Sequence, residues 1–184
     1  DRGLTWRSLT DGLSALSVGA VALAPSDPSI VYLGTGEGGY GGGFIPGIGI
    51  LRSSDGGESW QLPDGVLAPL VYRLSVDPRD PRTVLAFVNG GAYRSTDGAR
   101  TWVRTSAASW GDGTDVARDA GNPDVLHATF WASGQTSRYA KSTDAGRTWI
   151  EKTAGLPGNP KSQTSLAISS NGAIGAGLQN TCRS

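Results

Sequence analysis

Short alternations of apolar and polar residues run along the whole chain. Tyr72, Leu74 and Val76 are one example: every second side chain is apolar, which suits a β-strand with one buried face. A sustained three-to-four spacing of apolar residues, which would indicate an amphipathic helix, is missing from the sequence. Turn signals such as Asp11-Gly12 and Asn89-Gly90 separate the alternating stretches. The pattern predicts an all-β protein built from many short strands.

An eight-residue phrase divides these strands into repeats. It reads SSDGGESW at residues 53–60, STDGARTW at 95–102 and STDAGRTW at 142–149, and the chain starts with DRGLTW, the same phrase without its first two residues. Its tryptophans recur at intervals of roughly 40 to 55 residues, a period typical of β-propeller blades. Four antiparallel strands at this period cannot bury their faces alone, and they pack against neighbouring sheets around an axis. The repeat therefore predicts a β-propeller of four-stranded antiparallel blades.

The repeat also predicts how the chain is divided. We expect a single β-propeller segment over residues 1–184, holding about four blades' worth of strands: three complete blades and two partial ones. The chain would then be an arc of a larger ring. We also expect that it does not fold stably alone, because half-blades at its ends leave unpaired strand edges. Residues 1–12 are expected to end a preceding blade, with its last strand at 4–9. The complete blades are unit one at 16–63, unit two at 70–105 and unit three at 113–153. Unit four, at 163–184, is the first half of a further blade.

Each position of the phrase has a structural explanation. Asp55, Asp97 and Asp144 follow the end of a strand, where a carboxylate accepts hydrogen bonds from turn N–H groups, so we expect a structural and not a catalytic role. Glycine two residues later permits a left-handed backbone; because unit two has Ala99 there, we expect its turn to be slightly altered. The tryptophan is large enough to fill the wedge between adjacent blades. The predicted structural set is Asp1, Gly3, Trp6, Ser53, Asp55, Gly57, Trp60, Ser95, Asp97, Trp102, Ser142, Asp144, Gly146 and Trp149.

Composition removes several classes of function. Lysine plus arginine equals aspartate plus glutamate at 16 each, so no net field attracts the chain to nucleic acid. No apolar run is long enough to suggest a membrane span. His127 is the only histidine and Cys182 the only cysteine, so we expect neither a metal site nor a cofactor, and we interpret His127 as a packed or edge residue rather than a catalyst. Cys182 is either a free thiol or paired outside this sequence.

The phrase resembles the Asp-box, or bacterial neuraminidase repeat. The segments at 24–37 and 76–85 are more similar to the xyloglucanase and sortilin-like branch of these propellers than to sialidases. The resemblance implies that each box lies between the third and fourth strands of a blade, on the face opposite the ligand site. It also implies an extracellular, periplasmic or cell-surface location.

The same resemblance bears on catalysis. In xyloglucanase-like enzymes a catalytic acid precedes a Gly-Gly-Ala-Tyr-Arg segment, which occurs here at 90–94, but the position of the acid is occupied by Val88. Valine cannot hold a proton, so we expect no paired-carboxylate site at this position. The opening Arg-Ile-Pro signature of sialidases is also missing; the nearest string is Phe44-Ile45-Pro46. We therefore assign no catalytic residue.

Ligand contacts are expected from loops at one end of the blades, those joining second to third strands and those joining one blade to the next. Trp110 and Trp131 are the two tryptophans outside the phrase; they could stack on a sugar or anchor a partner, or each could pack beneath its own loop. Glu37 is the only acid in a glycine-rich run, where backbone approaches a ligand closely, although such a run is more often a flexible insertion. The candidate ligand-binding residues are Glu37, Tyr40, Phe44, Trp110, Asp112, Trp131, Gln135, Gln179 and Asn180.

These observations favour a non-catalytic Asp-box β-propeller module of a secreted or cell-surface protein. Such a module would bind a protein partner or a carbohydrate, or act as an assembly scaffold, and would pack against the remaining blades of its own propeller. The alternative is a fragment of a glycoside hydrolase, xyloglucanase-like or sialidase-like, whose catalytic residues lie mostly outside this sequence. A third hypothesis is an assembly factor of a membrane complex.

Overall fold

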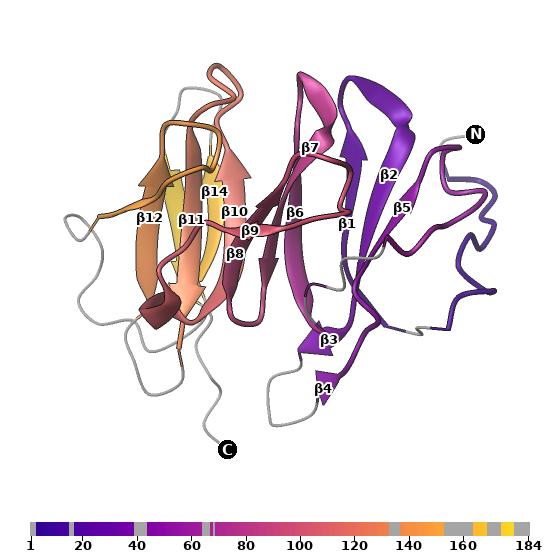
Figure 1. Cartoon of the computed structure of the whole chain (residues 1–184), viewed down its shortest axis with the longest axis horizontal. Helices are drawn as coiled ribbons and strands as arrows, with labels where there is room; N and C mark the ends of the chain where they lie inside the picture. The colour runs from indigo at the N-terminus through magenta and orange to yellow at the C-terminus, as the bar shows by residue number, and fades with distance from the viewer. Residues whose placement is uncertain are drawn as a thin grey trace.

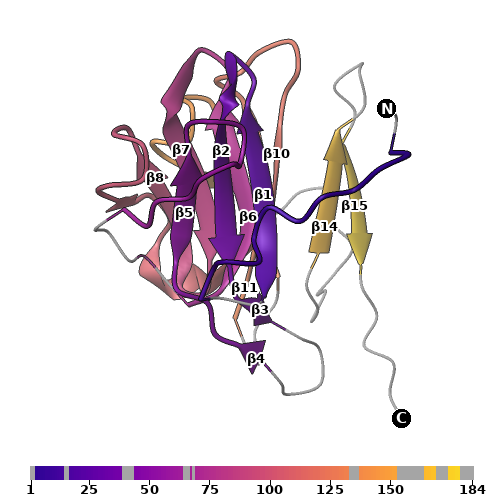
Figure 2. The same cartoon turned by 90° about the vertical axis from the view of Figure 1, so that its right-hand side faces the viewer.

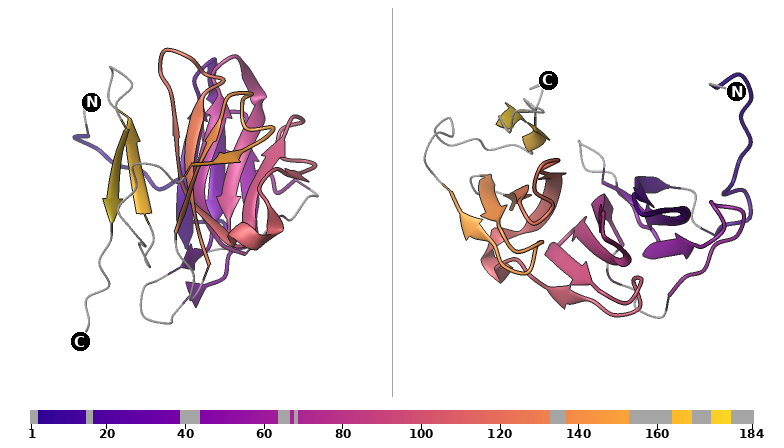
Figure 3. Two further views of the ribbon diagram at one scale, coloured as in Figure 1. Left: turned by 90° about the vertical axis from the view of Figure 1, so that its left-hand side faces the viewer. Right: turned by 90° about the horizontal axis from the view of Figure 1, so that it is seen from above.

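Antiparallel sheets stand side by side along the molecule, as Figure 1 shows for a computed structural model of the chain. The structure describes residues 3–14, 17–38, 44–63, 67, 69–132, 137–152, 164–168 and 174–178. Seen from above in Figure 3, the sheets follow one another along a curved row. This part of the chain contains no helix long and apolar enough to cross a membrane.

Units two and three are the four-stranded sheets that the repeat predicts. Each is a meander in which consecutive strands pair, in the orders β6-β7-β8-β9 and β10-β11-β12-β13. A short 3₁₀ turn, η1 (Ala108–Trp110), precedes unit three. The strands of unit two are β6 (Val71–Asp77), β7 (Asp80–Val88), β8 (Gly91–Ser95) and β9 (Val103–Arg104), and those of unit three are β10 (Asp112–Arg118), β11 (Leu126–Trp131), β12 (Arg138–Ser142) and β13 (Ile150–Glu151).

Units one and four have fewer strands. In unit one the expected fourth strand is reduced to one β-bridge between Arg52 and Gln61, with N···O distances of 2.8 and 2.9 Å. Unit four contains one antiparallel pair of strands. The strands are β1 (Val18–Ala24), β2 (Asp27–Thr35) and β5 (Ile50–Ser53) in unit one, the short pair β3 (Glu37–Gly38) and β4 (Phe44–Ile45) inserted between β2 and β5, and β14 (Thr164–Ile168) and β15 (Ile174–Leu178) in unit four.

The strand predicted at residues 4–9 is wrong. Residues 3–14 contain no strand, and Leu4 and Trp6 are 86% and 90% exposed. No described strand lies beside this segment to complete a ladder, so its backbone gains nothing from an extended register. Instead it runs along the turn formed by the repeated phrase of unit one, residues 53–60. We call this turn, and its equivalents at 95–102 and 142–149, the box turn of each unit. Arg7 pairs there with Glu58, and the Trp60 indole donates to the Leu9 carbonyl at 2.9 Å.

The first strands of the units line the inner side of the row. Strand β1 contacts β6, β6 contacts β10, and β10 contacts β14, an arrangement that Figure 2 shows from the side. Glycine makes this approach possible: a Cβ at Gly19 of β1 would lie 2.1 Å from the Val71 carbonyl oxygen of β6. Because each unit is packed through its first strand, the order of the sheets in space follows the order of the repeats.

The hydrophobic core lies between neighbouring sheets, and successive side chains of β7 point alternately into the two clusters on either side of it. Val84, Ala86 and Val88 pack toward unit one, where the cluster includes Tyr32 and Ile50. Leu85 and Phe87 pack toward unit three, against the apolar side chains Leu126, Ala128, Phe130 and Ala140. All five β7 side chains are fully buried, because successive residues of a strand point to opposite faces and here each face has a neighbour.

The box tryptophans join adjacent units. The Trp149 ring packs edge-on against Phe87 of unit two at 5.8 Å and against Phe130 of its own unit at 6.3 Å. Its indole nitrogen donates to Thr105 Oγ1 at 3.1 Å, three residues after Trp102 of the preceding box. The acceptor of the Trp60 indole, the carbonyl of Leu9, likewise lies three residues after the preceding tryptophan, Trp6. The position of the tryptophan between adjacent units was predicted from the size of its indole, and the hydrogen bond adds a second contact between the units.

The box turn of unit two is not altered, contrary to the prediction from Ala99. Ala99 adopts φ 72°, the same left-handed region as Gly57 at 97° and Gly146 at 79°. Its N–H donates to Ser95 Oγ at 3.0 Å, and the other two boxes form the equivalent bond at 2.8 and 2.9 Å. The network of hydrogen bonds therefore holds a non-glycine residue in a conformation that costs roughly 1–2 kcal/mol.

Candidate functional site

The connections between strands lie at two opposite ends of the units. Because the strands are antiparallel, the first hairpin and the box turn of a unit share one end, and the second connection and the link to the next unit share the other. Figure 1 shows β3, β4 and η1 together at this second end, which we call the loop end. The predicted ligand residues within the described chain belong to it. Four others, Tyr40, Gln135, Gln179 and Asn180, lie outside the described residues.

Asp112 holds the loop end of units two and three together. Its Oδ1 accepts a hydrogen bond from the Gly90 N–H at 2.8 Å, in the hairpin between β7 and β8. Its Oδ2 accepts one from the Tyr72 hydroxyl at 3.2 Å. Both carboxylate oxygens are therefore used to fix the hairpin, which is a structural contribution whether or not a ligand also contacts this residue.

Trp110 and Trp131 are both half-buried. The Trp110 ring packs against Phe130 with centroids 5.0 Å apart, beneath the 3₁₀ turn that carries it. Trp131 pairs with Asp112 across β10 and β11, and its indole nitrogen is buried without an acceptor among the described residues. The packing of Trp110 matches the alternative in which an indole supports its own loop. The structure brings Trp110, Asp112 and Trp131 together at unit three.

Glu37 and Phe44 lie on the small ladder that projects from unit one. Glu37 pairs with Ile45 and Gly38 with Phe44, so the two ends of the glycine-rich stretch lie side by side. The Glu37 side chain is exposed, and Ile45 beside it is 55% exposed. An exposed carboxylate next to an exposed apolar side chain is a combination that can contact a partner.

Val88 ends β7 at the loop end. It is fully buried and pairs with Gly91 across the hairpin that starts the Gly-Gly-Ala-Tyr-Arg segment. Its side chain packs in the core between units one and two. The position at which the family resemblance implies a catalytic acid thus carries an apolar side chain that points into the protein.

The box carboxylates are occupied by their own turns. Asp97 Oδ1 accepts from Ser95 Oγ at 2.8 Å and from the N–H groups of Arg100 and Thr101 at 3.0 Å each, and Oδ2 accepts from Thr101 Oγ1 at 2.6 Å. Asp55 and Asp144 form the matching bonds to Ser59 and Thr148. Burial raises the pKa of Asp97, but these hydrogen bonds outweigh it and hold the pKa at about 2. The predicted cap is present in all three turns.

His127 is buried on β11 and paired with a tyrosine. Its Nδ1 shares a hydrogen bond with the Tyr139 hydroxyl, and the two rings stack with centroids 5.8 Å apart. Burial lowers the pKa of His127, the charge of Lys141 on the next strand lowers it further, and Asp119 opposes both. It is a packed residue, as its isolation in the sequence predicts.

We expect this histidine to make stability fall in mild acid. The unfolded chain binds a proton near the ordinary pKa of 6.5, whereas the folded chain binds it only at lower pH, so the free energy of unfolding decreases as pH drops below about 6.5. Urea unfolding at several pH values between 8 and 5.5 measures this slope. In the His127→Gln protein the slope over this range is expected to be smaller, and equal slopes in both proteins would contradict the assignment.

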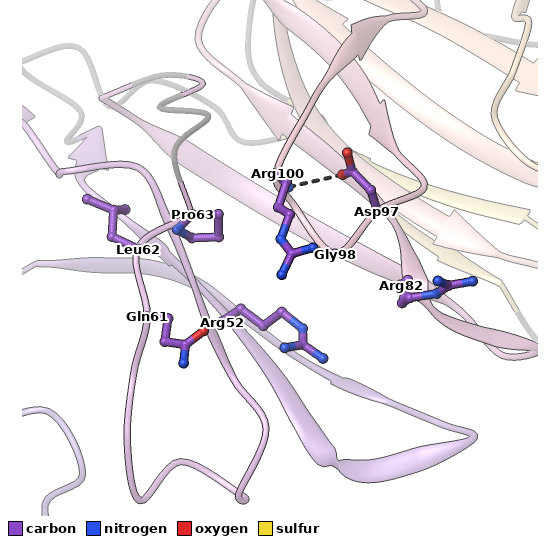
Figure 4. Close-up of a pocket in the computed structure, with 8 residues that line it drawn as sticks. All are labelled: Arg52, Gln61, Leu62, Pro63, Arg82, Asp97, Gly98 and Arg100. Atoms are coloured by element: carbon purple, nitrogen blue, oxygen red, sulfur yellow. Dashed lines mark hydrogen bonds between the residues drawn. The ribbon is translucent and has the colours of Figure 1, made fainter.

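A pocket of about 280 Å³ lies between units one and two, at the end of the sheets that carries the box turns. Figure 4 shows its lining: Arg52 from β5 with Gln61, Leu62 and Pro63 on one side, and Arg82, Asp97, Gly98 and Arg100 from unit two on the other. The side chains of Arg52 and Arg100 extend into the same gap, and Arg82 lies at its rim. These arginines were not among the residues predicted from the sequence, although Arg52 and Arg100 have fixed positions relative to the repeated phrase.

Comparison with known proteins gives the fold. No family model and no curated protein matches the sequence. The structure is similar to an ancestral GH74 enzyme (TM-score 0.69, 18% identity, 89% of this chain and 21% of that chain) and to a GH74 enzyme of Niastella koreensis (0.57, 22%, 86% and 25%). It is also similar to YCF48 bound to a D1 peptide (0.53, 15%, 85% and 44%). The chain folds as a β-propeller. It spans between about a fifth and under half of the length of these structures.

In this β-propeller the loop end and the arginine-lined pocket lie at opposite ends of the units. Arg82 stands at the start of β7, next to the first hairpin of unit two, and Arg100 belongs to the box turn of the same unit. Asp112 and Glu37 belong to the connections at the other end. A ligand at one end leaves the other end accessible, so the two sites are separate candidates.

Proposed function

We propose that this chain is a non-catalytic module of the Asp-box propeller family, part of a secreted or cell-surface protein, and that it binds a protein partner through its loop end. The loop end offers an exposed carboxylate at Glu37, beside the exposed Ile45, and the half-buried Trp131 farther along the row. Aromatic side chains are enriched at protein recognition sites, whose apolar centre is surrounded by a polar, solvent-accessible rim. Carbohydrate is the other ligand class that such aromatic side chains favour.

Val88 is the observation that carries the non-catalytic assignment. Glycoside hydrolysis needs two carboxyl groups on either side of the scissile bond. Here a buried valine occupies the position of the acid, and the nearby Asp112 is engaged on both oxygens by the hairpin and by Tyr72. Both oxygens of this carboxylate therefore help to hold the loop end together.

The fold similarity supports both a binding module and an enzyme. One similar structure is YCF48 with a D1 peptide bound, which is a precedent for a propeller that recognises peptide. The GH74 enzymes, together with the Gly-Gly-Ala-Tyr-Arg segment at 90–94, favour glycoside hydrolysis as a second candidate. In that case the catalytic residues would lie mostly outside this sequence.

Assays on xyloglucan and on sialosides, run beside glycan-array and peptide-array binding, separate the two candidates. We expect binding without turnover, and we expect Glu37→Gln to weaken binding because the exposed carboxylate is lost. Asp11→Asn, a change of the same kind at the N-terminal turn, is the matched control and should leave binding unchanged. Turnover that disappears in the Glu37→Gln protein would overturn the proposal and identify an enzyme.

A further inference from the structure

The pocket between units one and two concentrates positive charge. Three of its eight lining residues are arginines, contributed by β5, by the start of β7 and by the box turn of unit two. Arg82 lies 3.6 Å from Asp80, whereas neither Arg52 nor Arg100 forms an ion pair within the part of the chain that the structure describes. We propose that this pocket binds a tetrahedral oxyanion, a phosphate or sulfate group, between the guanidinium groups of Arg52 and Arg100.

A buried donor in the pocket lacks an acceptor. The Nε–H of Arg52 is buried without an acceptor among the described residues, and the Tyr32 hydroxyl interacts with the same guanidinium. Arg94, at the matching position of unit two, has the same unpaired Nε–H, so the cluster of three arginines, and not this donor alone, distinguishes the pocket. A buried donor without an acceptor costs roughly 1–3 kcal/mol, so most such groups in proteins find one. Gly98 adjoins this guanidinium: a Cβ there would lie 3.4 Å from Arg52 Nε, at van der Waals distance. An anion in the pocket would supply the missing acceptor.

The one acidic lining residue does not neutralise the arginines. Asp97 directs both carboxylate oxygens into its own turn, where they accept four hydrogen bonds from Ser95, Arg100 N–H and Thr101. Figure 4 shows the Asp97 carboxylate turned away from the gap that Arg52 and Arg100 enter. Three guanidinium groups and one carboxylate leave the lining with a net positive charge.

The repeats provide an internal comparison that separates this charge from the requirements of the fold. At the junction of units two and three, Arg94 and Arg147 correspond to Arg52 and Arg100, but Asp124 occupies the position of Arg82. Asp124 pairs with Arg79, and the Arg147 guanidinium donates to the Asp144 carbonyl at 2.8 Å. In unit one the position of Arg100 carries Glu58, which pairs with Arg7. Only the first junction combines three arginines, so the repeat itself does not require the cluster.

The arrangement of the two arginines favours a tetrahedral anion over a carboxylate. One guanidinium fork already uses both oxygens of a carboxylate. Arg52 and Arg100 approach the gap from different units, so their N–H donors point into it from different directions, whereas the two oxygens of a carboxylate lie in one plane. Phosphate and sulfate groups carry three or four oxygens and match two forks at once. The volume of about 280 Å³ accommodates such a group but is small for an extended ligand.

NMR titration of the protein at pH 7 and constant ionic strength tests this proposal. Sodium phosphate, sodium sulfate and sodium acetate are added in turn while the arginine Nε–H resonances are followed. We expect saturable shifts with phosphate and with sulfate, and an affinity for acetate about tenfold weaker. The relative affinities of phosphate and sulfate indicate which kind of ester the site prefers. Shifts that acetate reproduces at the same concentration would overturn the assignment to a tetrahedral anion.

Substitutions locate the site. Arg100→Gln and Arg52→Gln should each weaken phosphate binding by about tenfold, the size of one lost charge-assisted hydrogen bond. Arg100 is exposed, so its replacement tests binding without risk to the fold, and Arg100→Lys should restore part of the affinity because it keeps the charge but not the fork. Arg147→Gln, at the matching position of unit three, is the control and should change affinity less than twofold. Equal losses in Arg147→Gln and Arg100→Gln would overturn the proposal.

Discussion

Replacing Trp149 by alanine is expected to lower the free energy of unfolding by about 3 kcal/mol. The indole fills the space between units two and three, where it contacts Phe87 and Phe130. Alanine leaves a cavity there and removes the hydrogen bond to Thr105. Because the two units meet through few elements, loss of this contact weakens a whole junction. Urea unfolding followed by fluorescence of the remaining tryptophans measures the change.

Two phenylalanine variants separate the hydrogen bond from the packing. Trp149→Phe keeps an aromatic ring but loses the bond to Thr105, whereas the Trp102 indole nitrogen is buried and has no acceptor among the described residues. Trp149→Phe should therefore cost about 1 kcal/mol more than Trp102→Phe, the usual net contribution of one hydrogen bond. Equal losses in the two variants would show that packing alone links the units.

The strands were predictable because they follow a local pattern. Alternation and turn residues located the meanders of units two and three. The prediction failed at residues 4–9, where the alternation is also present but no described strand pairs with the segment. A strand is stabilised by its neighbours, so an alternating sequence is necessary for a strand but not sufficient.

The turn of unit two shows a second limit of sequence patterns. Alanine at position 99 suggested a changed turn, since residues with a Cβ avoid positive φ. The hydrogen bonds from Ala99 N–H to Ser95 and from Thr101 to Asp97 hold the same turn nevertheless. The energy of several bonds exceeds the strain at one residue, and that balance is visible only when all partners are placed.

The pocket was not predictable from one repeat, because two units form it together. Arg52 belongs to unit one and Arg100 to unit two, 48 positions later in numbering, and the packing of β1 and β2 against β6 brings their units together. Comparing the three repeats position by position would have revealed the unusual arginine at 82, because the matching residue in unit three is Asp124. Only the structure shows that these side chains share a gap.

Asp97→Ala is expected to lower the free energy of unfolding by about 3 kcal/mol. The change removes the acceptors of four hydrogen bonds and leaves the N–H groups of Arg100 and Thr101 without their partners. Bonds to a charged group each contribute about 1.5–3 kcal/mol, and solvent at this half-exposed turn replaces part of the loss. Asp97→Asn keeps one acceptor oxygen and should be affected less. Asp11→Ala, which removes a carboxylate with one bond to Ser8, is the control and should change stability little.

The same carboxylate should also determine part of the acid sensitivity. Its pKa in the folded protein is about 2, below the ordinary value of 3.8, because the hydrogen bonds outweigh the effect of burial. The folded state therefore loses the benefit of the ionised group only as pH falls below about 4 toward 2, whereas above that range the contribution is complete. Urea unfolding of the wild-type and Asp97→Asn proteins at pH 7 and at pH 3 tests this. The difference in stability between them should shrink at pH 3; a constant difference would mean that the carboxylate holds the turn through shape and not through charge.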